Sequence, residues 1–491
     1  MNIALIRSAV AAVVGLSLIA EAQAKPELIF HLDFNTCVMN RKTVLGLLDH
    51  VAKQGYTAIL WEIENAVRFE CAPEIASPDA CSRAEFGEVL AHAQELGLEA
   101  IPLMQTIGHG EYVLDHDKYR HLRENPNEKD CYCPSKPATL AFLKALLHEY
   151  LEIFGPDVKR FHLGGDEVYS FRTCTTCKQR PEAELYVSHL EAVAEELRAK
   201  GIRPGVWHDM LRHFDQTGGA FAKLPKDFTL WYWEYFYPRG QDWAIGAEEG
   251  VRREIRAGRE VFFCSAIQCH QDDPFMVRYG QHRGNVDGTV DVCRKEGMSG
   301  YCVTSWMCHQ GPKELQKPLI DFAAKRYLNP GVLAETDWQD IVRRYYGDVS
   351  VDLLDQLTAW HYECRYFDGR CWTKFKDGIA PGRGYFAKYW GERTSGALHN
   401  ASFARCLAGG VREGADKLAR VPQERRGPLV PLLLEAAALK ADYLEMAADG
   451  MLGHKIRPIP YECARRFYSR EMCPQSVECA LRRIYQGYEK E

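Results

Sequence analysis

The sequence lacks the features that mark several large classes of protein. It has no basic stripe and no long run of one charge, and its formal net charge is -6 with a pI near 6.3. We therefore expect no nucleic-acid partner, because phosphate binding needs clustered Lys and Arg. No G-x-G-x-x-G opens the first expected helix, which argues against a dinucleotide-binding fold. No internal repeat or low-complexity tract stands out either.

The first 24 residues have the pattern of an export signal. Arg7 supplies the positive charge, residues 8–20 are apolar, and Ala22-Gln23-Ala24 offers a small-residue cleavage site. The apolar stretch is short for a membrane span, and no later segment is apolar enough to cross a bilayer. We expect a signal peptide at 1–24 and a mature chain exported to a periplasm or the cell exterior. The alternative is an uncleaved anchor.

All 18 cysteines follow this segment. An exported chain meets an oxidising compartment, so we expect several disulfides. Cys131-x-Cys133 and Cys174-x-x-Cys177 could instead hold a structural zinc ion. The first spacing is too short for a standard zinc ribbon, so the sequence favours disulfides or free thiols. No cysteine lies in a recognisable nucleophile motif. We expect no cofactor and no metal in the active site.

Eight short apolar runs, each followed by a polar loop and a helical pattern, predict an α/β fold of the (β/α)₈ TIM-barrel type. The runs are 28–34, 58–63, 99–105, 160–163, 203–207, 229–233, 260–266 and 300–306. The clearest helical patterns between them are 42–53, 83–96, 137–154, 183–200 and 248–257. Near-continuous apolar strands indicate a parallel sheet covered on both faces. Eight such units favour a barrel over the runner-up, an open doubly wound sheet.

The strand pattern stops after about residue 335, and a helical C-terminal region follows. Thr336-Asp337-Trp338-Gln339 is typical of a capping box that opens a helix. Further helical patterns cover 352–366, 394–420, 431–448 and 476–487, and Pro and Gly punctuate 378–384. We therefore divide the chain into the signal peptide, a barrel domain at 25–335 and a helical region at 336–491.

The most informative segment is residues 161–168, where an apolar stretch ends in Gly164-Gly165 and then in Asp166-Glu167. The C-terminal end of a buried strand is where an α/β barrel places its chemistry. Two neighbouring acids repel as anions, so one tends to keep its proton near neutral pH. This pairs a proton donor with a charged stabiliser, as cleavage of a glycosidic bond requires. A solvated turn is the alternative for Asp-Glu alone.

The other expected strand ends carry residues suited to a sugar. Indole rings stack on the flat faces of sugars, while carboxylates and imidazoles bind hydroxyls. A tryptophan could instead pack in the core, and a histidine could simply orient its neighbours. The candidate binding residues, in chain order, are Asp33, Glu62, His109, His162, Trp207, Asp209, Tyr232, Trp233 and Trp306.

These residues resemble glycoside hydrolase family 20, the β-N-acetylhexosaminidases. The H-x-G-G-D-E run at 162–167 is similar to the acid motif of that family. Segments 31–33, 60–64, 101–109, 133–135 and 207–211 resemble its hexosaminidase D-like branch, in order along 28–310. The barrel at 25–335 would then be a glycoside hydrolase catalytic domain.

The resemblance implies a substrate-assisted retaining mechanism, in which the substrate's own 2-acetamido oxygen attacks C1. Glu167 would protonate the leaving oxygen and later deprotonate water. Asp166 would bind the acetamido N–H and stabilise the oxazolinium-like intermediate. Adjacent strand residues point to opposite faces. Both acids can therefore reach one sugar only if the strand ends or bulges at Gly164-Gly165.

Two departures from the family pattern concern substrate recognition. Many members end strand seven with a tyrosine that holds the acetamido oxygen, whereas this chain has Ser265-Ala266-Ile267-Gln268. Tyr232 or Tyr235 could substitute. Many exo-acting members follow the strand-eight tryptophan with a glutamate, whereas Trp306 precedes Met307-Cys308. The choice between galacto and gluco sugars therefore stays open, although the hexosaminidase D-like branch is associated with N-acetylgalactosamine.

The sequence thus predicts an exported exo-β-N-acetylhexosaminidase. It would remove terminal β-linked N-acetylgalactosamine or N-acetylglucosamine from a glycan or glycoside. The first alternative is a glycan-binding barrel with little catalysis, because the tyrosine and the glutamate are missing. The second is an endo-acting or disaccharide-releasing relative. The oligomeric state stays open.

Overall fold

The computed structural model describes residues 27–35, 37–235, 249–269, 272, 274–306, 311–359, 394–452, 454, 459 and 461–485. The expected signal peptide, the 378–384 stretch and Met307-Cys308 lie outside these residues. Within the described chain, no helix combines the length and the apolar character needed to cross a membrane. The described cysteines form no disulfide with one another, which differs from the sequence expectation.

The core of the molecule is a closed parallel barrel in which each strand pairs with the next and β8 pairs with β1. The strands are β1 Glu27–Asp33, β2 Ala58–Glu62, β3 Glu99–Leu103, β4 Arg160–His162, β5 Arg203–Trp207, β6 Thr229–Trp233, β7 Val261–Gln268 and β8 Gly300–Ser305. Every strand lies within two residues of its predicted bounds. The barrel prediction is therefore confirmed.

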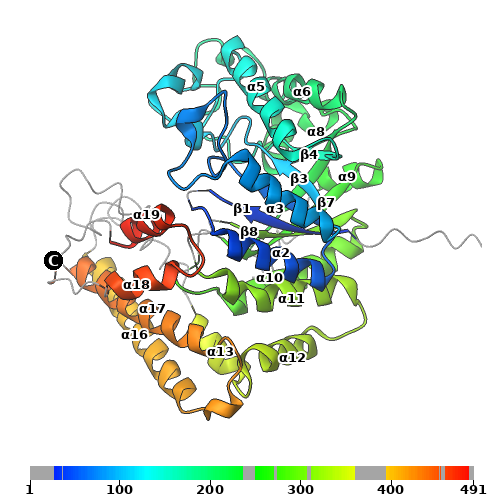
Figure 1. Cartoon of the computed structure of the whole chain (residues 1–491). Coiled ribbons are helices and arrows are strands. Elements are labelled where there is room, and N and C mark those ends of the chain that lie inside the picture. Colours follow the sequence, from blue (N-terminus) through cyan, green and yellow to red (C-terminus); the bar gives the residue numbers. More distant parts are fainter. Residues whose placement is uncertain are drawn as a thin grey trace, which may run out of the picture.

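Helices cover the outside of the barrel (Figure 1). They are α2 Arg41–Gln54, α3 Arg83–Glu95, α4 Glu111–Leu114, α5 Pro137–Phe154, α6 Glu182–Arg198, α7 Asp209–Gly218, α8 Ala220–Lys223, α9 Glu249–Arg256, α10 Tyr279–Lys295 and α11 Lys313–Leu328. Short 3₁₀ turns lie at η1 Pro73–Ile75, η2 Asp117–Leu122 and η3 Cys177–Gln179. Local sequence sets where helices begin: the Asn40 side chain caps α2, and Ser82 with Glu85 forms a capping box on α3.

Strand alternation divides the hydrophobic core into two layers. Side chains such as Ile29, Trp207 and Trp231 fill the barrel interior, whereas alternate positions such as Leu28 and Trp61 pack outward against helices. Because successive side chains point to opposite faces, this alternation decides which strand-end residues reach the barrel mouth.

The chain after β8 is helical where it is described, as predicted. Its helices are α12 Ala334–Tyr346, α13 Val351–Thr358, α16 Thr394–Ala419, α17 Val430–Leu452, α18 Tyr461–Tyr468 and α19 Pro474–Tyr485, with the turn η5 Gln423–Arg425. Figure 1 shows the orange and red helices gathered beside α10 and α11. The division of the chain at residue 335 stays a prediction.

Two details of this region differ from the sequence analysis. The prediction of a capping box at Thr336 is wrong, because α12 already begins at Ala334 and its N-cap residue, Leu333, makes no side-chain hydrogen bond. Helix α18 was not predicted.

The last helices return to the barrel: Met39 bridges Met472, and Ser476 Oγ accepts the Val38 N–H at 2.8 Å. The C-terminal region therefore braces the loop after β1.

Candidate active site

The segment that carries the paired acids leaves β4 through two glycines in the left-handed region. Gly164 has φ 66° and Gly165 has φ 92°, values that side chains disfavour. A Cβ on Gly164 would collide with the Gln105 side chain, and one on Gly165 would lie 2.6 Å from the Tyr186 hydroxyl. Because β4 ends at His162, the strand alternation stops before the acids. Both acids can therefore lie on the same side of the chain, as the sequence argument required.

His109, on the loop after β3, lies between the two acids. Its Nε2 is 3.6 Å from Asp166 Oδ2 and 3.4 Å from Glu167 Oε2. The Asp166 side chain is 10% exposed, whereas that of Glu167 is 41% exposed. Asp209, the first residue of α7, accepts the Glu167 N–H at 3.0 Å. The structure thus brings four of the predicted site residues together.

Burial sets the protonation of this group. It raises the pKa of Asp166 from 3.8 to about 7, although His109 acts in the opposite direction. Burial also raises the pKa of Asp209 to about 7, and the charge of Asp166 adds to the effect. Burial lowers the pKa of His109, but Asp166 and Glu167 raise it more, so it stands well above 6.5. Near neutral pH the site therefore holds the His109 imidazolium beside an Asp166 carboxyl group that is partly protonated.

A second polar group lies at the end of β2. Glu62 Oε2 is 3.0 Å from His31 Nε2, and Glu62 Oε1 accepts a hydrogen bond from Gln105 Nε2 at 3.0 Å. Burial raises the pKa of Glu62 to about 7. His31 and Gln105 were absent from the predicted site. The alternation of side-chain directions along a strand could have indicated them, because His31 lies on the inward face of β1 together with Asp33.

Asp33 and Glu64 meet through Asn35 at the same edge. Asp33 Oδ1 accepts the Asn35 N–H at 2.6 Å, and the Asn35 side chain donates to Glu64 Oε1 at 3.3 Å. Glu64 (φ 39°), like His109 (φ 48°) and Glu167 (φ 46°), has a left-handed backbone. Such strain costs about 1–3 kcal/mol per residue and clusters at functional sites. Only Arg172 adds a fourth non-glycine example among the described residues.

Aromatic side chains gather at the ends of β5, β6 and β8. Trp233 and Tyr235 stack at 5.1 Å between ring centroids, and Trp306 Nε1 donates to the Tyr235 hydroxyl at 2.9 Å. Trp207 is fully buried and lies 5.7 Å from Trp306, so it forms part of the floor. Three buried polar atoms here have no hydrogen-bond partner among the described residues: Asp166 Oδ1, Trp207 Nε1 and Trp233 Nε1. An unpaired buried polar group is costly, and the hydroxyls or amide of a bound sugar could satisfy these atoms.

Two predicted residues take other positions. Tyr232 points outward and packs against His208 and Phe263, at 4.3 and 5.2 Å between ring centroids, because alternation turns Trp231 and Trp233 inward instead. His162 is buried beneath Trp207, and its Nδ1 accepts the Gly164 N–H at 3.0 Å. His162 thus orients the glycine turn, as the alternative in the sequence analysis held.

Paired carboxylates after the fourth strand of a (β/α)₈ barrel, close to several tryptophans, are an arrangement typical of glycoside hydrolases with this fold. Residues 65–267 match the model of the glycosyl hydrolase family 20 catalytic domain.

Two relatives and a solved structure are similar to this chain. Hexosaminidase D of Bos taurus is 34% identical over 190 residues, which cover 37% of this chain and 55% of that protein. Hexosaminidase D of Homo sapiens is 35% identical over 164 residues, covering 32% and 34%. The β-N-acetylhexosaminidase structure from Bacteroides fragilis NCTC 9343 has a TM-score of 0.48 and 18% identity, covering 64% of this chain and 66% of that one. The chain thus spans about half of the bovine relative and a third of the human one.

Proposed function

We propose that this protein is an exo-β-N-acetylhexosaminidase that removes terminal β-linked N-acetylgalactosamine or N-acetylglucosamine with retention of configuration. One observation carries the proposal: adjacent Asp166 and Glu167 lie within 3.6 Å of the same His109 nitrogen. The family match and the two hexosaminidase D relatives support the same substrate class.

Glu167 is the general acid and base in this mechanism. As the substrate's acetamido oxygen attacks C1, Glu167 gives a proton to the glycosidic oxygen and the C1–O bond breaks. Glu167 then takes a proton from the water that attacks C1 and opens the oxazolinium ring. Its partial exposure supports this role, because it must meet both the leaving group and water.

Asp166 holds the acetamido group. Its buried Oδ1 has no hydrogen-bond partner within the part of the chain that the structure describes, so it can accept the acetamido N–H and stabilise the positive charge that develops on the ring. The His109 imidazolium favours the ionised form of Asp166. Tyr235, whose hydroxyl accepts a hydrogen bond from Trp306 Nε1 and also contacts the Thr304 side chain, is the candidate to hold the acetamido oxygen in place of the missing strand-seven tyrosine.

The remaining rim would bind the sugar. Asp33 and Glu62 are suited to hydroxyls, and Trp233 and Trp306 to the sugar face.

We further propose that residues 1–24 direct export. The N-terminal sequence of protein recovered outside the cytoplasm tests this: it should begin at Lys25, and protein retained inside with an intact N-terminus would contradict it.

The test of the activity compares wild type with Glu167→Gln on the 4-nitrophenyl β-glycosides of N-acetylgalactosamine and N-acetylglucosamine. Wild type should release 4-nitrophenol, and the variant should lose at least about 100-fold in kcat, since general acid–base catalysis contributes about that much. The ratio of the two wild-type rates names the preferred sugar. Sugar binding by calorimetry without hydrolysis would contradict the proposal and favour a glycan-binding barrel.

A further inference from the structure

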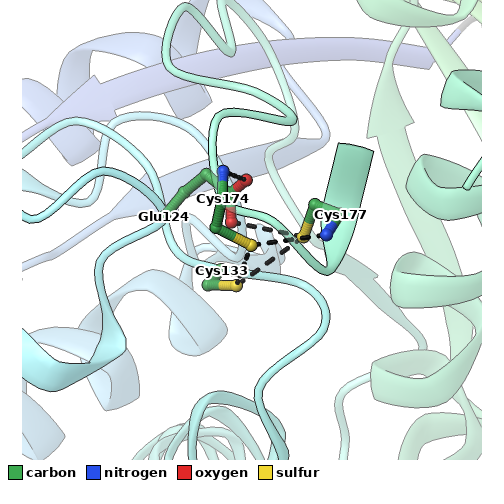
Figure 2. Close-up of side chains that lie close together, drawn as sticks. All are labelled: Glu124, Cys133, Cys174 and Cys177. Carbon is green, nitrogen blue, oxygen red and sulfur yellow. Dashed lines mark hydrogen bonds between the residues drawn. The ribbon is translucent and has the colours of Figure 1, made fainter. Parts of the chain in front are cut away.

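A second cluster of reactive side chains lies outside the active site, where the loop after β3 meets the loop after β4. Glu124 and Cys133 come from the first loop, and Cys174 and Cys177 from the second. Figure 2 shows the three sulfurs and the carboxylate turned toward one another. One ligand atom from each residue lies within 4.8 Å of all the others.

The spacing of the sulfurs fits a metal ion and not a disulfide. Cys133 Sγ lies 3.8 Å from Cys174 Sγ and 3.7 Å from Cys177 Sγ. Tetrahedral zinc with Zn–S bonds of about 2.3 Å separates its sulfurs by about 3.8 Å, whereas a disulfide needs about 2.05 Å. Glu124 Oε2 lies 3.3 Å from Cys177 Sγ, close to the roughly 3.5 Å between sulfur and oxygen ligands of one zinc ion.

The donor set selects the metal and the kind of site. Three thiolates and one carboxylate favour zinc over hard cations such as magnesium or calcium. Four protein ligands complete a tetrahedron and leave no open position, which is typical of structural zinc. Glu124, Cys133 and Cys177 are buried, so the thiols can ionise beside the Glu124 carboxylate only with a cation between them.

The surrounding backbone is arranged to support anionic ligands. The Cys174 N–H donates to Glu124 Oε1 at 2.9 Å, and the Cys177 N–H donates to the Cys174 sulfur at 3.3 Å. Ser135 Oγ lies 3.0 Å from the Cys177 sulfur. Hydrogen bonds of this kind orient metal ligands and stabilise their charge. Leu185 of α6 packs against Cys133 and Cys177 and helps to enclose the cluster.

We propose that Glu124, Cys133, Cys174 and Cys177 bind one structural Zn²⁺ that joins the loop after β3 to the loop after β4. Binding releases the protons of the three thiols and involves no oxidation or reduction. The same two loops carry His109 and Glu167.

Short contacts connect this zinc site to the active-site loops. The Tyr132 N–H donates to Ile107 O at 2.9 Å, and the Gly110 N–H donates to Asp130 O at 3.0 Å. Ser170 Oγ donates to Asp130 Oδ1 at 2.7 Å. The zinc ion would therefore hold the imidazole of one loop in register with the acids of the other.

A second group, Cys269, Asp272 and His282, is also compact enough for a metal. It offers three ligands, however, and Arg278 Nε lies 3.8 Å from Asp272 Oδ1 while His282 Nδ1 lies 2.8 Å from Ala266 O. Asp272 and His282 therefore already have an ion-pair or hydrogen-bond partner in the protein. It supplies the control for the experiment, because Cys269→Ser should not change the metal content.

The experiment measures zinc per chain by mass spectrometry of the metal in the full-length protein, purified without chelator. Wild type should hold about one zinc ion, and Cys133→Ser and Cys174→Ser should hold almost none. Cys131→Ser is the matched control, because the Cys131 thiol donates to Tyr132 O and lies outside the cluster. It should keep its zinc.

A measurement on the wild type alone guards against variants that fail to fold. After exchange of the metal for Co²⁺, the absorption spectrum should show thiolate-to-cobalt charge transfer and the strong d–d bands of tetrahedral cobalt. Folded wild type that takes up no metal when zinc is supplied would overturn the proposal. So would a disulfide between two of the cluster cysteines in freshly purified protein, or zinc that is lost with Cys269→Ser but kept with Cys133→Ser.

Discussion

Replacing His109 by glutamine removes the positive charge that faces both acids. The relevant distance is 3.6 Å between His109 Nε2 and Asp166 Oδ2. Unit charges about 4 Å apart interact by about 1 kcal/mol in water and about 4 kcal/mol at an effective dielectric constant of 20. Because 31% of the His109 side chain is exposed, solvent screening favours the lower half of that range. At about 1.4 kcal/mol per unit, the pKa of Asp166 should rise by about 1 to 2 units.

The sign of the effect on activity follows from the role that we propose for Asp166. The carboxylate must be ionised to accept the acetamido N–H, and burial has already raised its pKa to about 7. Activity is therefore lost as the pH falls through that pKa, and a further rise moves the loss to higher pH. The acid limb of kcat/KM should shift upward by about 1 to 2 pH units in His109→Gln.

The assay is the pH profile of kcat/KM on a 4-nitrophenyl N-acetylhexosaminide, read after an alkaline stop. His121→Gln is the control, because His121 is exposed on the same loop and its Nδ1 lies 2.9 Å from Lys118 O. Its profile should match that of wild type. An acid limb in His109→Gln that stays in place, or moves to lower pH, would refute the electrostatic argument.

Three further predictions concern stability and recognition. Because burial raises the pKa of Asp166 from 3.8 to about 7, ionising this carboxyl group destabilises the fold as the pH rises through that range. Asp166→Asn should therefore be more stable than wild type by about 2 to 4 kcal/mol at pH 8 and by much less at pH 5. Urea unfolding at the two pH values measures the difference. Gly165→Ala should destabilise the protein and lower kcat, because its Cβ would collide with the Tyr186 hydroxyl. Gly97→Ala is the control: Gly97 has a similar φ of 76° and open space around its Cβ, so the change should cost only about 1 kcal/mol and keep kcat. Equal losses in the two variants would contradict this steric argument. Tyr235→Phe should lower kcat/KM about 100-fold, as loss of an oxyanion donor does, whereas the outward Tyr232→Phe should stay near wild type.

The barrel could be predicted closely because parallel strands buried on both faces are continuous apolar runs. The direction in which individual side chains point was harder to predict. Alternation through β6 turns Tyr232 outward and leaves Tyr235, beyond the strand end, beside Trp306. A single tyrosine in a run of aromatic residues gives no sign of its direction until the register of the strand is known.

The parts of the site that escaped prediction depend on contacts between distant segments. His31 and Gln105 both contact Glu62, and each comes from a different strand or loop. Cys133 and Cys174 are 41 residues apart, so only the meeting of two loops brings their sulfurs to 3.8 Å. Spacing within one motif therefore favoured disulfides or free thiols, whereas the folded geometry favours a metal.

The most direct test of the central claim varies the nucleophile in the substrate. Successive fluorination of the N-acetyl group makes its carbonyl oxygen less nucleophilic and changes the rest of the glycoside little. If this oxygen attacks C1 while Asp166 and Glu167 assist, kcat/KM should fall steeply from acetyl to trifluoroacetyl, by about 100-fold or more. A rate that hardly responds to fluorination would contradict substrate assistance and require a nucleophile from the protein or from water.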